Sequence, residues 1–106
     1  MDHELSGKIA ELASRVNNLV VASTGDNCRI LQQLEDQLTK YVLVAIRMDL
    51  DSEALSYKAA LTQLNTSIAA IDSADDALSK IGDIITDIKN CVDLVDKALT
   101  IAASFL

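Results

Sequence analysis

The segment ADDALSKIGDIITDIKNCVDLVDKALTIAASFL, residues 74–106, decides the fold class of this chain. Its apolar residues recur at alternating steps of three and four, a spacing that places them on one face of an α-helix. These residues are Leu78, Ile81, Ile85, Ile88, Val92, Val95, Leu99 and Ala102. A single helix over the whole segment would be roughly 50 Å long at the usual rise per residue. We expect the other helices to be shorter, so part of this apolar face is predicted to need cover from another surface.

The same rhythm continues through the rest of the chain and predicts three further helices, over residues 4–22, 28–48 and 53–71. Ser23 to Asn27 form a polar, glycine-containing link between the first two, and a link this short favours an antiparallel hairpin. The 106 residues include no proline and three glycines, too few for the many turns of a sandwich or barrel. We therefore predict one all-α domain over residues 1–106, an antiparallel helical bundle.

The number of helices depends on residues 72–76. Asp72, Ser73, Asp75 and Asp76 are poor helix formers, and Ser73 followed by Asp76 is typical of a helix start. However, the apolar rhythm continues through Ile71, Ala74 and Leu78 with one slip, and neither glycine nor proline marks a helix end. The sequence favours a break and four helices. The alternative is a bundle of three, in which the last two form one continuous helix.

The core is predicted from the apolar stripes of these helices. It comprises Leu5, Ile9, Leu12, Val16, Leu19, Leu31, Leu34, Leu38, Leu61, Leu64, Ile68, Leu78, Ile81, Ile85, Ile88, Val92 and Val95. The run from Tyr41 to Ile46 is apolar all round the helix rather than on one face. It is therefore expected to be buried on several sides, either at the centre of the bundle or at an interface.

The charge of the chain limits its partners. Sixteen acidic residues against nine basic ones give a net charge of −7, which repels the phosphates of nucleic acids and of anionic membranes. No apolar run reaches the roughly 18 residues of a membrane span, and the first residues contain no apolar signal core. Cys28 and Cys91 are far apart in the sequence, without a metal-binding spacing, and we interpret them as reduced thiols. These observations predict a cytoplasmic protein.

No constellation for catalysis or ligand binding is recognisable. The single histidine is His3, so a base for an activated serine or cysteine is missing. Asp49, Asp51 and Glu53 resemble the start of a calcium loop, but Ala54 and Ala60 occupy the positions that require Gly and Glu. Glycine-rich phosphate loops are absent. We expect no enzyme activity, no cofactor and no metal.

The predicted function is that of a non-catalytic helical protein–protein interaction module. Its interaction surface is expected on the C-terminal helix, at Val95, Leu99, Ala102, Phe105 and Leu106, and a homodimer packed knobs-into-holes is the simplest assembly. A single helical protein partner is the other form of this prediction. Two alternatives remain open. One is a dedicated acidic partner of a basic client, such as an inhibitor, an immunity-type protein or a secretion chaperone. The other is a membrane-active helical protein.

Overall fold

The computed structural model describes residues 4–47, 54–73 and 77–103, and these residues form an all-helical bundle. Four α-helices make up the bundle: α1 (Glu4–Ala22), α2 (Gly25–Arg47), α3 (Leu55–Ser73) and α4 (Ile81–Ala103). A short 3-10 turn, η1 (Ala77–Lys80), leads directly into α4. The prediction of an all-α bundle with four helices is confirmed, and the alternative with one continuous final helix is wrong.

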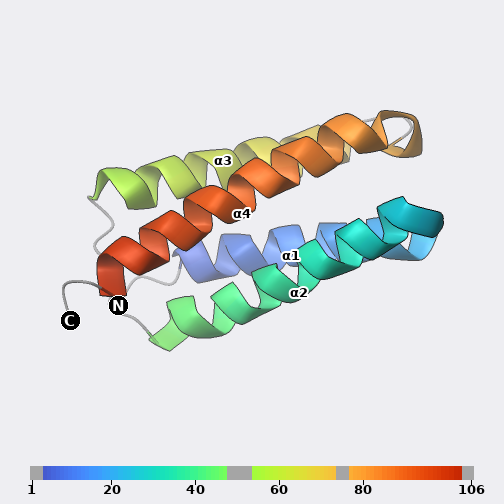
Figure 1. Ribbon diagram of the computed structural model, residues 1–106. Coiled ribbons are helices and arrows are strands. Elements are labelled where there is room, and N and C mark those ends of the chain that lie inside the picture. The colour runs from blue at the N-terminus through green and yellow to red at the C-terminus, as the bar shows by residue number, and fades with distance from the viewer. Residues whose placement is uncertain (1–3, 48–53, 74–76, 104–106) are drawn as a thin grey trace.

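The four helices form two hairpins that pack face to face (Figure 1). In the first hairpin α1 packs against α2, and in the second α3 packs against α4. Between the hairpins α1 contacts α3 and α2 contacts α4, so α1 and α4 lie on one diagonal of the bundle and α2 and α3 on the other. Figure 1 shows the two helices of each hairpin running in opposite directions. The resulting body measures 41 × 22 × 18 Å.

The turn between α1 and α2 is tighter than the sequence suggested. Only Ser23 and Thr24 separate the two helices, and α2 begins at Gly25 rather than at Cys28. Gly25 has a φ of 65°, which is easily adopted by glycine and rarely by other residues. The Ser23 amide donates a hydrogen bond to the Val20 carbonyl (3.3 Å), which closes the last turn of α1. Asp26 then lies in the first turn of α2, where an acidic side chain interacts favourably with the helix dipole.

The core consists of the inward-facing stripes of all four helices. Nearly all of the predicted core residues are buried, and Leu61 and Ile81 are partly buried against them. The side chain of Leu78 lies outside the described part of the chain. The core also contains Ala45, Tyr57, Ala60, Ile84, Cys91, Ala98 and Leu99. Aliphatic side chains of this kind fill the space between helices at the density typical of protein interiors.

The last helix is shorter than predicted. α4 has 23 residues, the same number as α2, because η1 and the residues before it separate α4 from α3. Within the described residues, the α-helix predicted over 74–106 begins at Ile81, so its described part is no longer than α2. The prediction that part of the apolar face on the C-terminal helix needs cover from another surface was based on its greater length. That basis is lost.

Candidate interaction surfaces

Of the predicted interaction residues, Val95 and Leu99 lie inside the bundle. Val95 is fully buried and Leu99 is 5% exposed, both within the core cluster. Ala102 is half-buried near the end of α4. Phe105 and Leu106 lie outside the described residues. The other helices of the bundle cover Val95 and Leu99, so a partner cannot reach them while the bundle stays closed. The predicted interaction surface on the C-terminal helix stays a prediction.

The exposed apolar side chains are concentrated at the carboxyl end of α2. Leu43 is 54% exposed, Val44 41% and Ile46 48%. They belong to the apolar run from Tyr41 to Ile46. Within that run Ala45 is buried and Tyr41 and Val42 are partly buried. The run is therefore not buried on several sides within one chain, and the interface interpretation of it stays a prediction.

A polar contact joins this end of α2 to α4. The Tyr41 hydroxyl donates a hydrogen bond of 3.1 Å to an Asp96 carboxylate oxygen. Burial of the ring, together with the nearby Asp96 carboxylate, raises the pKa of Tyr41 to about 12. The hydroxyl therefore stays neutral at physiological pH and can keep donating this bond. The contact links the side of α2 that carries Tyr41 to α4.

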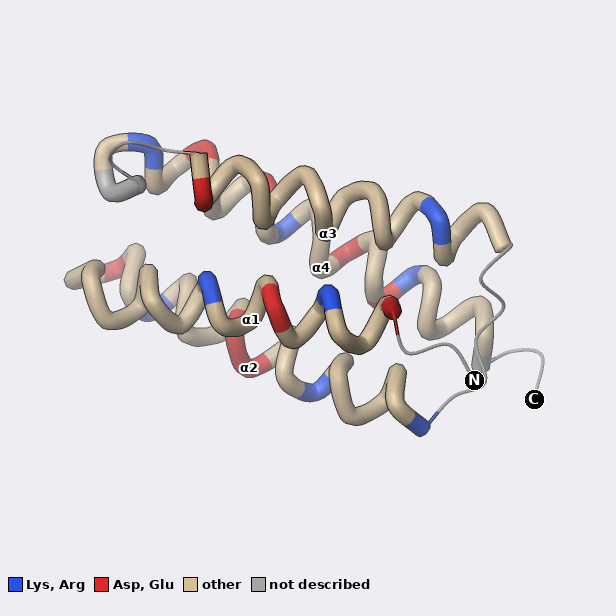
Figure 2. Tube along the Cα trace, turned by 180° about the vertical axis from the view of Figure 1, so that it is seen from behind, with Lys and Arg blue, Asp and Glu red and all other residues tan. Residues whose placement is uncertain are grey.

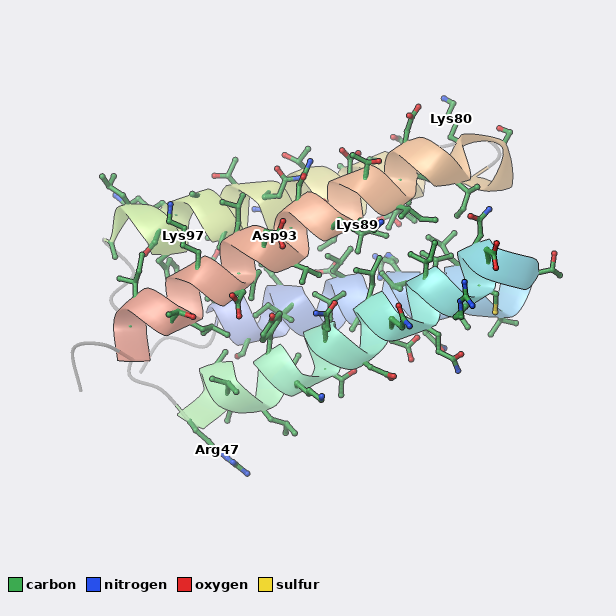
Figure 3. All side chains as sticks on the ribbon, in the orientation of Figure 1. Arg47, Lys80, Lys89, Asp93 and Lys97 are labelled. Carbon is green, nitrogen blue, oxygen red and sulfur yellow. The ribbon has the colours of Figure 1, made fainter. Side chains whose placement is uncertain are left out.

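Leu55, which is 85% exposed, borders a shallow groove between α3 and α4. The groove has a volume of about 350 Å³ and is lined by Leu55, Ser56, Ala59, Leu94, Lys97 and Ile101. Lys97 is the charged residue of this lining, and its side chain lies on the outer surface of α4 (Figure 3). An apolar groove of this kind is suited to a side chain of a protein partner, because its lining has few groups that could orient a small polar ligand.

A second groove, of about 310 Å³, lies between α2 and α4. It is lined by Ile30, Gln33, Leu34, Gln37, Lys89, Val92 and Asp93. Figure 3 shows Lys89 and Asp93 on the part of α4 that borders it. A smaller pocket of about 200 Å³, beside the turn between α1 and α2, is formed by Ala22, Ser23, Thr24, Asn27 and Ile81. The Ser23 hydroxyl oxygen is enclosed there and has no hydrogen-bond partner among the described residues.

The charged residues do not gather on one face. Acidic and basic side chains alternate along α1 (Figure 2), where Glu11 pairs with both Lys8 and Arg15 at 3.4 Å. Arg15 also reaches across to α3, and its Nε donates to Asp72 Oδ1 at 2.9 Å. This ion pair lowers the pKa of Asp72 and raises that of Arg15. In the described part of the chain it joins the first hairpin to the second.

The two cysteines are free thiols in different surroundings. Cys28 is partly buried, and its thiol donates to the Val20 carbonyl at 3.5 Å. Cys91 is fully buried, and burial raises the pKa of its thiol to about 12, partly opposed by a hydrogen bond with Ser67. A thiol with so high a pKa is protonated at neutral pH and is a poor nucleophile.

The described ranges contain neither a metal-binding cluster of side chains nor a helix suited to crossing a membrane. In residues 4–47, 54–73 and 77–103, no group of three or more His, Cys, Asp and Glu side chains is arranged to hold a metal ion. None of the helices described there is both long and apolar enough to cross a membrane. The acidic segment 49–53 and His3 lie outside these ranges.

Comparison with protein-family models, with curated proteins and with solved structures finds no match for this chain.

Proposed function

We propose that this chain is a non-catalytic helical protein–protein interaction module that associates with a second copy of itself. The observation that carries the proposal is the exposure of Leu43, Val44 and Ile46 at the carboxyl end of α2. Single exposed apolar residues are common on protein surfaces, whereas clusters of large ones are typical of contact sites. Leu43, Val44 and Ile46 all lie within the last two turns of α2, so large apolar side chains surround this end of the helix.

The packing of the bundle supports this location for the contact. The inward stripes of the four helices already cover one another, including Val95 and Leu99. Self-association along the buried face of α4 would therefore require the bundle to open. The end of α2 can be covered without any such rearrangement, because its apolar side chains are already in solvent.

The oligomeric state in solution tests this proposal. We expect light scattering after size-exclusion chromatography to give a mass that rises towards that of a dimer as the concentration of the full chain increases. A small interface of this kind is expected to be weak, so the series should extend to high micromolar concentrations. A monomer mass at every concentration would contradict self-association.

A second candidate function is that of an acidic partner for one basic protein. It is favoured by the net charge of −7 and by acidic residues on the outer surface of α4, among them Asp83 and Asp93. Charge-steered binding weakens steeply as salt is added, whereas an apolar self-interface is much less sensitive. Binding to a basic protein that does not weaken as salt is added would contradict charge as the basis of this candidate function.

A further inference from the structure

We propose that two copies of the chain pack the outer face of α2 antiparallel against itself. The outer face of α2 consists of Asp36, Lys40, Leu43 and Arg47, with Val44 and Ile46 at its borders. This inference rests on the self-association proposed above and adds the surface, the direction of packing and the residues that pair.

The spacing of these residues places them on one side of the helix. They follow one another at steps of four, three and four, which keeps them aligned along α2 over about three turns. The buried residues of α2, which are Leu31, Leu34, Leu38 and Ala45, lie on the opposite side. All four residues of the outer face are exposed. The face is therefore open to a second helix along its whole length.

The apolar part of this face lies between two charges of opposite sign. Leu43 follows Asp36 by about two turns and precedes Arg47 by about one. Neither Asp36 nor Arg47 has an ion pair or hydrogen bond within the described residues. Arg47 extends away from the bundle at the end of α2 (Figure 3). Both charges are thus free to pair with another molecule.

Antiparallel packing makes these charges complementary. With the two-fold axis between Lys40 and Leu43, Asp36 lies opposite Arg47 of the partner subunit, and symmetry produces the same pair twice. Leu43 then faces Lys40 of the partner subunit, whose methylene groups can cover it while the ammonium group stays in water. Parallel packing would instead bring like charges together at both positions. Along α2 this face carries an acid, a base, a leucine and a base in that order. A second copy is therefore complementary to it in the antiparallel orientation and not in the parallel one.

Charge-reversal variants test the pairing. We expect Asp36→Arg and Arg47→Asp each to raise the dimer dissociation constant by about tenfold or more, because each places like charges opposite one another. The double variant restores opposite charges and is expected to recover most of the affinity. Lys89→Asp changes the net charge as much as Arg47→Asp does, but lies on α4 and should leave the dissociation constant unchanged.

A separate variant tests the apolar contact. Leu43→Glu removes the leucine and places a carboxylate within one turn of both Lys40 and Arg47, spacings that favour the helix of the monomer. We expect the fold to be kept, as monitored by circular dichroism, and the dimer to be lost. This variant keeps the proposal testable if either charge reversal disturbs folding.

The outcomes of these experiments distinguish a wrong interface on α2 from a wrong proposal of self-association. A wild-type dimer that is unaffected by the single reversals and by Leu43→Glu would overturn the outer face of α2 and leave self-association standing. Weakening by the single reversals without recovery in the double variant would overturn the antiparallel pairing. A wild-type chain that stays monomeric at every concentration would overturn the proposed self-association as well.

Discussion

At the scale of single residues, Ser67 and Cys91 are polar side chains buried where α3 and α4 meet. Ser67 is 1% exposed, its hydroxyl donates to the Asp87 carbonyl at 3.4 Å, and it accepts a hydrogen bond from Gln63 Nε2 at 3.2 Å. Cys91 lies fully buried beside it. A buried hydroxyl with partners costs far less than one without them. Both side chains are therefore compatible with a largely apolar core.

The two thiols should differ in reactivity. At pH 8 the Cys91 thiol is protonated, because its pKa is about 12, and it is also shielded from reagents. We expect a thiol reagent such as Ellman's reagent to modify Cys28 alone in the folded chain and both cysteines in denaturant. Cys28→Ser is the matched variant and should abolish the native reaction. Rapid modification of two thiols in the native protein would contradict the burial of Cys91.

Truncation of a core side chain should be costly. Ile88 is fully buried, and we expect Ile88→Ala to lower the free energy of unfolding by about 2–5 kcal/mol, since it removes buried methyl groups and leaves a cavity. Val21, which is 79% exposed, provides the control. Val21→Ala should have little effect. Urea denaturation followed by circular dichroism measures both. Equal stabilities of the two variants would show that the core is wrongly placed.

At the scale of elements, the docking of one hairpin on the other combines apolar packing with polar contacts between side chains. Tyr41 and Asp96 join α2 to α4, and Arg15 and Asp72 join α1 to α3. The second pair is solvent-exposed, so water and salt reduce its contribution. The apolar stripes supply most of the free energy of docking.

The Arg15–Asp72 pair predicts a specific dependence on pH. The pKa of Asp72 is lower in the folded than in the unfolded chain, so the pair stabilises the fold above the unfolded pKa. This contribution disappears as the pH falls through the lowered pKa. We expect Asp72→Asn to lower the urea midpoint at pH 7, and its difference from the wild type to vanish in strong acid. In the Arg15→Gln background the same substitution should have no effect at either pH. A constant difference across the titration would exclude the ion pair as its cause.

At the scale of the whole molecule, stability should depend on concentration if the proposed dimer forms. A partner that binds the folded chain and not the unfolded chain shifts the folding equilibrium by mass action. We expect the melting temperature of the wild-type chain to rise with protein concentration, whereas that of Leu43→Glu should stay constant. The Lys89→Asp variant should behave like the wild type. A constant melting temperature for the wild type would contradict a dimer of folded chains.

The four helices and most of the core could be predicted from the sequence. Residues such as Leu5, Ile9 and Leu12 recur at helical spacing, and this periodicity is local, so it survives any rearrangement of neighbouring helices. The break after Ser73 could also be predicted from a local property, because poor helix formers weaken a helix whatever it packs against. The boundaries at Gly25 and Ile81 were less accurate, since helix ends depend on a few hydrogen bonds of the last turn.

The surface available to a partner was decided by the tertiary structure. The stripe containing Val95 and Leu99 is equally suited to packing inside one chain or between chains, and its period does not distinguish the two. The hairpins dock so that other helices cover these residues. Leu43, Val44 and Ile46 stay exposed, because the core-facing side of α2 is already occupied by Leu38, Ala45 and their neighbours. The sequence alone thus determined which residues form amphipathic helices, a property of local spacing. Burial requires a second surface, and only the non-local pairing of the two hairpins decided where that surface lies.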